Sequence, residues 1–76
     1  MTVTVSTRTA GSSSVVEECG ERSRTDAILA AAGKLLGYQV NIMAWQRLGD
    51  NLHIITVGRG SKYLNVDAEL TVVTSP

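Results

Sequence analysis

The chain has 76 residues, and a domain of that length buries only roughly 60% of the surface that its unfolded form exposes. Disulfides, structural zinc and association with another chain are the usual reinforcements for so small a domain. One cysteine, Cys19, and one histidine, His53, exclude an intrachain disulfide and a four-ligand zinc site. Seven basic residues balance seven acidic ones, which argues against a dedicated nucleic-acid binder.

The longest apolar run covers residues 27–32 and is far too short to span a bilayer, and no basic cluster precedes a long apolar segment. A lone cysteine fits a reducing compartment. We therefore expect a cytoplasmic protein with a single domain over residues 1–76, with no metal or cofactor and no membrane partner.

Residues 2–8 alternate Val3 and Val5 with threonine and serine, which predicts a short strand. Residues 9–22 are expected to form a loop or a short helical turn. Small residues fill positions 10–14, and Ser14 followed by Glu17 has the spacing of a capping box.

A helix is predicted over residues 24–36. Ser23 and Asp26 offer a capping box, and Gly37 follows as the residue that ends the helix. The apolar residues recur at the spacing of one helical face, and they are Ile28, Leu29, Ala32, Leu35 and Leu36.

Three strands are predicted after the helix. Residues 38–46 alternate, residues 52–57 are apolar on both faces, and residues 62–73 alternate almost without error, with turns at 48–51 and 58–61. The fold class is α+β: a single helix packed on a mainly antiparallel sheet of three to four strands, in the order β-α-β-β-β.

One helix covers only one face of such a sheet. We expect the other face to display an apolar patch formed by Met43, Trp45, Ile55, Val57 and Tyr63. Because a monomer rarely exposes such a patch, this favours a homo-oligomer or a protein partner that covers it. The resulting hypothesis is a non-enzymatic binding or accessory protein, with the size and composition of small inhibitors from phages and mobile elements.

Catalysis has few candidate residues. His53 is the one imidazole that a hydrolase triad could use, and its apolar strand is typical of a packed or interfacial histidine. Cys19 lies among three acidic residues, Glu17, Glu18 and Glu21, which disfavours a reactive thiolate. We therefore expect no enzymatic activity.

The alternative hypothesis is nucleic-acid or phosphate binding through the loop at residues 58–62. Two glycines beside Arg59, Ser61 and Lys62 let backbone donors and cations approach a phosphate, with Arg47 and Lys34 as possible helpers. The loop resembles the glycine loop of KH domains and the Arg-Gly loop of the Alba family. A helix follows those loops, whereas residues 63–73 have the period of a strand, so neither fold is expected here.

A second alternative is flavin binding. The order of helix, tryptophan-bearing strand and two further strands resembles dodecins, small flavin-storing assemblies in which a tryptophan stacks on the isoalloxazine ring. The resemblance implies a flavin stacked on Trp45, and the wide spacing from Trp45 to Tyr63 agrees with it. Leu64 stands where that family would have a polar side chain.

Overall fold

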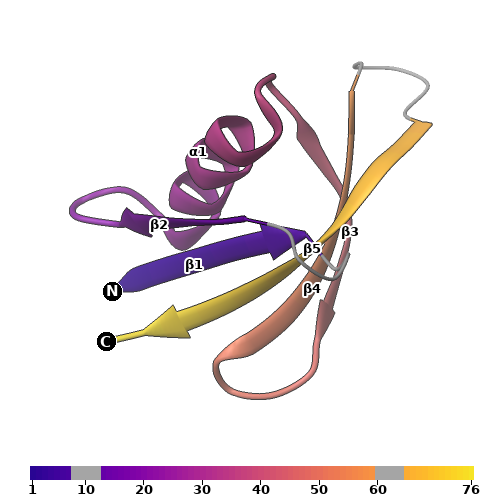
Figure 1. The fold of residues 1–76 in the computed structure, drawn as a ribbon. Helices are drawn as coiled ribbons and strands as arrows, with labels where there is room; N and C mark the ends of the chain where they lie inside the picture. The colour runs from indigo at the N-terminus through magenta and orange to yellow at the C-terminus, as the bar shows by residue number, and fades with distance from the viewer. Residues whose placement is uncertain (8–12, 60–64) are drawn as a thin grey trace.

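The computed structural model describes residues 1–7, 13–59 and 65–76, which form one helix and five strands. The strands are β1 (Thr2–Thr7), β2 (Ser14–Glu18), β3 (Asn41–Arg47), β4 (Leu52–Arg59) and β5 (Asn65–Ser75), and the helix α1 (Arg24–Leu36) joins β2 to β3. They build one antiparallel sheet in the order β2-β1-β5-β4-β3 (Figure 1). The α+β class is confirmed, but the expected three to four strands in the order β-α-β-β-β are wrong, because there are five in the order β-β-α-β-β-β.

The additional strand is β2, where the sequence predicted a loop or a helical turn. It pairs with β1 from Thr2 opposite Glu18 to Ser6 opposite Ser14. The capping-box spacing at Ser14 was misleading because one isolated helical turn is unstable on its own, whereas a strand beside β1 gains a full ladder of hydrogen bonds. Residues 9–12 of the expected loop lie outside the described residues.

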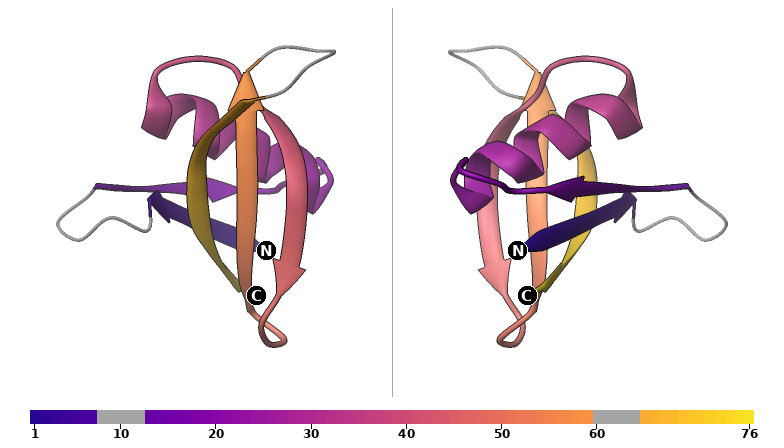
Figure 2. Two further views of the ribbon diagram at one scale, coloured as in Figure 1. Left: turned by 90° about the vertical axis from the view of Figure 1, so that its right-hand side faces the viewer. Right: turned by 90° about the vertical axis from the view of Figure 1, so that its left-hand side faces the viewer.

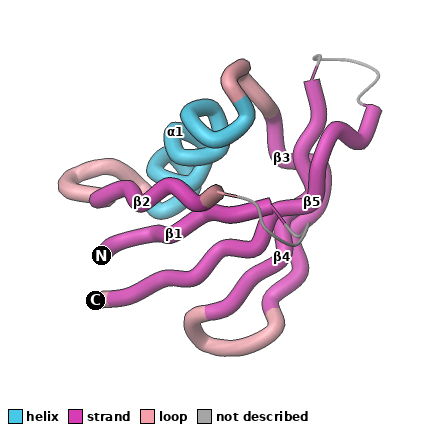
Figure 3. The backbone as a smooth tube through the Cα atoms, viewed as in Figure 1, coloured by secondary structure: helices cyan, strands magenta, loops and turns pink. Residues whose placement is uncertain are grey.

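The helix begins and ends as predicted (Figure 3). Ser23 accepts a hydrogen bond from the backbone N–H of Asp26 at 3.1 Å, and Gly37 adopts the left-handed conformation with φ of 86°. The Gly37 N–H donates to the carbonyl of Gly33 at 2.9 Å, which satisfies one of the last carbonyls of the helix. No helix in the described residues has the length and apolarity needed to cross a membrane.

The core lies between α1 and one face of the sheet, which we call the inner face. The sheet twists so strongly that β3 and β4 run steeply across the direction of β1 and β2, and α1 fills the hollow that this curvature leaves (Figure 2). Fully buried side chains meet there from α1 and three strands, β1, β4 and β5: Ile28 from the helix, and Val3, Val5, Ile55, Val57, Leu70 and Val72 from the sheet.

This arrangement corrects the expected apolar patch. Ile55 and Val57 are 0% exposed and face α1, so their assignment to an uncovered face is wrong. The reason lies in the register. Ile55 is opposite Leu70 and Val57 is opposite Ala68, so the four side chains share one face of the sheet, and that face packs against the helix. Trp45 is half-buried against the same core, Met43 is exposed at a bulge in the edge strand β3, and Tyr63 lies outside the described residues.

Candidate functional site

The second face of the sheet, which we call the outer face, carries a line of exposed aliphatic side chains. Val16 is opposite Thr4, Thr4 is opposite Val73, and Val73 is opposite Leu52, so these residues cross four adjacent strands in one row. Val16 is 60% exposed, Val73 is 46% exposed and Leu52 is 38% exposed. We call Val16, Val73 and Leu52 the aliphatic row.

Hydroxyl side chains surround the aliphatic row. By register, Thr2, Ser6 and Thr71 lie in the rows on either side of it. The carboxylate of Glu18, at the β2 edge, accepts a hydrogen bond from the Thr2 hydroxyl at 2.7 Å. The outer face is thus mainly polar, which differs from the broad apolar surface that the sequence predicted.

His53 and Trp45 form a second cluster, on the inner face. His53 is 1% exposed, and its Nδ1 accepts a hydrogen bond from the Trp45 indole N–H at 3.1 Å, with the two rings edge to face. The Arg24 guanidinium lies 5.1 Å from the centre of the Trp45 ring, a cation–π distance. The three residues come from β4, β3 and the start of α1.

The His53 imidazole is held neutral by this environment. Burial lowers its pKa from the ordinary 6.5, and the positive charges of Arg24 and Arg47 lower it further. Because Nδ1 accepts from Trp45, the proton of the neutral ring belongs on Nε2, which is buried and has no hydrogen-bond partner among the described residues. A buried imidazole whose accepting nitrogen is already occupied cannot serve as a general base for a substrate.

Arg24 also bears on the flavin alternative. A flavin that stacked on Trp45 would need an open face of the indole, and the Arg24 side chain occupies one face while His53 contacts the ring edge. Tyr63 lies outside the described residues. The flavin hypothesis stays a prediction, and the position of Arg24 argues against it.

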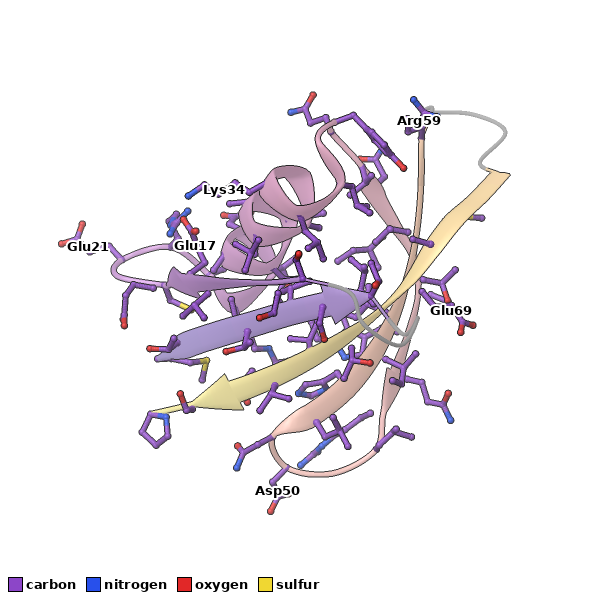
Figure 4. The ribbon with its side chains drawn as sticks, in the orientation of Figure 1. Glu17, Glu21, Lys34, Asp50, Arg59 and Glu69 are labelled. Atoms are coloured by element: carbon purple, nitrogen blue, oxygen red, sulfur yellow. The ribbon has the colours of Figure 1, made fainter. Side chains whose placement is uncertain are left out.

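The basic residues of the phosphate hypothesis that the structure describes, Lys34, Arg47 and Arg59, do not form one patch. Lys34 contacts the Glu17 carboxylate at 2.9 Å, and Arg47 contacts Asp50 at 2.8 Å beside the turn between β3 and β4. Arg59 lies at the other end of β4, roughly 20 Å from Arg47 at the rise of an extended strand. Figure 4 shows Asp50 and Arg59 at opposite ends of the molecule.

Arg59 instead contacts an aromatic side chain. Its guanidinium carbon lies 4.1 Å from the centre of the Tyr38 ring, in the segment between α1 and β3. Ser61 and Lys62, the other members of the predicted phosphate loop, lie outside the described residues. The phosphate role of this loop stays a prediction.

Glu17 links β2 to the helix. Its side chain is 13% exposed and contacts both Lys34 and Arg22, the latter at 3.2 Å. These hydrogen bonds, first from Lys34 and then from Arg22, hold the pKa of Glu17 below its ordinary value of 4.5. A carboxylate between two cations of its own chain stabilises the fold, and we assign it no ligand.

Comparison with known protein families, with curated proteins and with solved structures finds no match to the chain. Within the described ranges, no three histidine, cysteine, aspartate or glutamate side chains cluster closely enough to hold a metal ion. Functional inference therefore depends on the geometry of the chain itself.

The aliphatic row escaped sequence reasoning. Val73 and Leu52 each belong to strands that the sequence identified, but their alignment with Val16 depends on β2, which was expected to be a loop or helical turn. The available signal was the pair of adjacent β-branched residues Val15 and Val16 between Ser14 and Glu17, which fits an edge strand as well as a capping box.

Proposed function

We propose that this chain is a non-enzymatic binding protein that pairs with a second copy of itself through the outer face of its sheet. The observation that carries this proposal is the aliphatic row, in which three exposed side chains align across four strands. Exposed aliphatic side chains gain free energy when they leave water, and here the backbone already aligns them.

The row suits a two-fold symmetric contact. Val16 and Leu52 lie at its two ends, on β2 and β4, and Val73 lies on β5 near its middle. A two-fold axis parallel to the strands, between β1 and β5, would set Val16 of one copy against Leu52 of the other. Face-to-face sheets pack about 10 Å apart, so side chains of this size would meet.

Charge permits this pairing. In the same arrangement β1 faces β5 of the second copy and β2 faces its β4. Glu18 on β2 and Glu69 on β5 therefore do not face their own equivalents. The neighbouring threonines and serines can form hydrogen bonds across the contact, so their burial carries a small cost.

The expected affinity is modest. A stable interface buries roughly 800 Å² of each partner, about a sixth of the 4721 Å² surface of the chain. Three aliphatic side chains form a small apolar centre for such an area. We expect a dissociation constant on the order of 10 µM to 1 mM, because ordering and association costs offset most of the apolar gain.

Sedimentation velocity over about 10 µM to 1 mM protein tests the proposal. The wild type is expected to shift from monomer to dimer, and the double variant Val73→Thr, Leu52→Thr is expected to stay monomeric. Both changes retain side chains suited to a strand. Met43→Thr is the matched control, since Met43 is exposed on β3 away from the row.

Two outcomes would contradict the proposal. One is a wild-type chain that stays monomeric throughout that range. The other is a dimer that Met43→Thr weakens while the double variant leaves it intact, which would move the contact to the β3 edge. Circular dichroism of each variant confirms that the fold is retained.

A further inference from the structure

Trp45 is the side chain that attaches the second half of the edge strand β3 to the core. The ladder between β3 and β4 is irregular between Ile42 and Ala44, so residues 44–47 form a separate stretch of pairing after the bulge. Within that stretch Trp45 is half-buried and the other three residues are exposed. Because β4 is the one described strand beside β3, this stretch depends on its ladder with β4 and on the Trp45 side chain.

His53 provides the hydrogen-bond acceptor for Trp45. The two residues are diagonal neighbours across the ladder, since Trp45 is opposite Ile55 and His53 is opposite Arg47. The indole N–H donates to Nδ1 of His53 at 3.1 Å. The proton of the neutral imidazole is therefore on Nε2, which is buried, and no residue that the structure describes accepts from it.

A second proton on His53 is incompatible with this contact. Both ring nitrogens of an imidazolium are donors, so the Nδ1–H group would point at the indole N–H of Trp45. Turning the ring over does not remove the conflict, because it replaces one donor with the other. The side chain is also 1% exposed, and burying an unpaired charge is costly.

The charged groups around His53 oppose its protonated form. In its row of the sheet, β1 and β5 contribute Val5 and Val72, which are uncharged, and β3 contributes Arg47. From α1, Arg24 lies over the indole ring that contacts the imidazole. Burial lowers the pKa of His53 first, and the two arginines lower it further.

The remaining polar groups near His53 offer an imidazolium little compensation. Asp50, in the turn between β3 and β4, pairs with Arg47 at 2.8 Å, and its side chain is 93% exposed. Water and salt screen so exposed a carboxylate. The next residue on the inner face of β5 is Thr74, whose hydroxyl donates to Asn51 at 3.4 Å.

Trp45 is the residue of the pair that can move. His53 is on β4, which is hydrogen-bonded to a strand on each side, and its side chain is fully covered. Trp45 is half-buried on a strand with one described neighbour. Opening residues 44–47 would separate the two donors and let water reach the imidazole at the loss of few buried contacts.

We propose that the contact between Trp45 and His53 is an acid-sensitive switch: the neutral imidazole holds residues 44–47 of β3 against the sheet, and the imidazolium releases them. In the released state the indole ring and the edge of β4 are exposed to water. This switch does not depend on self-association, because the aliphatic row is on the outer face and has no member on β3.

The direction of the acid response follows from the two states of His53. In the released state the imidazole is in water with the ordinary pKa of 6.5, and in the closed state its pKa is lower. The contact is therefore at full strength above pH 6.5. Below that pH, the equilibrium constant for release rises about tenfold per pH unit until the pH reaches the closed-state pKa.

Hydrogen exchange followed by NMR measures this release. Protection factors, corrected for the intrinsic pH dependence of exchange, are expected to fall about tenfold per pH unit for the N–H groups of residues 44–47 that bond to β4. Low concentrations of urea are expected to leave these values unchanged, because a local opening exposes little surface, and to lower the values in β5, which follow global unfolding.

Three variants assign the acid response to the contact. His53→Gln keeps an acceptor for the indole and removes the titration, so protection of residues 44–47 is expected to be flat with pH. Trp45→Phe keeps a ring and removes the donor, and is expected to lower that protection about tenfold at neutral pH. Met43→Thr is the matched control: Met43 is exposed on β3 before this stretch, and its variant is expected to respond like the wild type.

Nitrogen NMR of the imidazole tests the donor and acceptor assignment without any variant. The chain has one histidine, so its two ring signals are unambiguous, and the Nε2–H tautomer is expected above pH 6.5. An Nδ1–H tautomer in that range would overturn the proposal. So would an acid response that His53→Gln retains, or wild-type protection of residues 44–47 that is independent of pH.

A further outcome would also overturn the switch. If residues 44–47 lose protection only together with β5, and with the same dependence on urea, then acid unfolds the whole chain and does not release β3. Circular dichroism at each pH establishes that the helix and the rest of the sheet are retained while residues 44–47 open.

Discussion

At the level of single residues, His53 and Trp45 form a polar contact inside a mainly apolar core. The indole N–H has its acceptor in Nδ1, while Nε2 of the same imidazole is buried without a partner in the described part of the chain. A buried donor left unpaired costs roughly 1–3 kcal/mol. The pair therefore limits stability and places one ionisable group in the core, whose pKa burial lowers from its ordinary value.

Stability is expected to fall as the pH drops below 6.5. Burial and nearby arginines lower the pKa of folded His53 below 6.5, the ordinary value, so the unfolded chain takes up a proton that the folded chain does not. The contribution is complete above pH 6.5 and is lost as the pH falls towards the folded pKa, at up to about 1.4 kcal/mol per pH unit. Urea unfolding followed by Trp45 fluorescence between pH 7.5 and 5 measures it.

The His53→Gln variant is the control for this titration. His53 is the one histidine of the chain, so removing it should leave the unfolding free energy nearly flat over the same pH range. Glu17, whose folded pKa lies below 4.5, contributes only at the acid end of that interval. A wild type as flat as the variant would contradict a lowered pKa for the buried His53.

At the level of elements, the end of α1 depends on the left-handed conformation of Gly37. Gly33, which lies within α1, does not cap the helix. Gly37 has φ of 86°, a conformation that L side chains rarely adopt, whereas Gly33 is within α1. Gly37→Ala is expected to cost about 1 kcal/mol of unfolding free energy, and Gly33→Ala to add about 0.5–1 kcal/mol. Chemical denaturation compares the two, and equal effects of the same sign would show that the cap is not the cause.

The elements also differ in how well sequence reasoning found them. Both ends of α1 were predicted because Ser23 and Gly37 mark them with local chemistry that needs no tertiary contact. β2 was missed because its five residues offer two valines and no apolar face of their own, and only pairing with β1 makes them a strand. The sequence thus predicts the ends of α1, which depend on neighbouring residues, but not β2, which depends on pairing with β1.

At the level of the whole molecule, β1, β5 and β4 form the interior of the sheet. Each is hydrogen-bonded to strands on both sides, whereas the edge strands β2 and β3 have one strand neighbour each. Backbone N–H groups in β1, β5 and β4 are therefore expected to exchange with solvent most slowly, and those of β2 and β3 at least about tenfold faster. Hydrogen exchange followed by NMR measures this, and equal protection across all strands would indicate that the sheet opens only as a unit.

The sequence does not show which side of residues 52–57 faces the helix, and the prediction for Ile55 and Val57 was wrong for that reason. Residues 52–57 are apolar on both sides, so nothing within that segment decides which side meets the helix. The decision comes from β5, which sets Ile55 against Leu70, and from β1, which sets Val5 against Val72. The contact between Arg59 and Tyr38 could not be predicted for a similar reason, since it joins the end of β4 to the segment before β3.

The central position of β5 has a consequence for how the protein is made. Both β1 and β4 pair with β5, which follows the other described strands in the sequence. β1 therefore cannot form its pairing with β5 until all the residues between the two strands have been synthesised. During translation, the β1–β2 hairpin and α1 leave the ribosome while the residues they will pack against are still being joined. We expect the nascent chain to complete its core only after β5, which ends at residue 75, has emerged. Until then, only β2 and α1 can reduce the exposure of Val3 and Val5 to water.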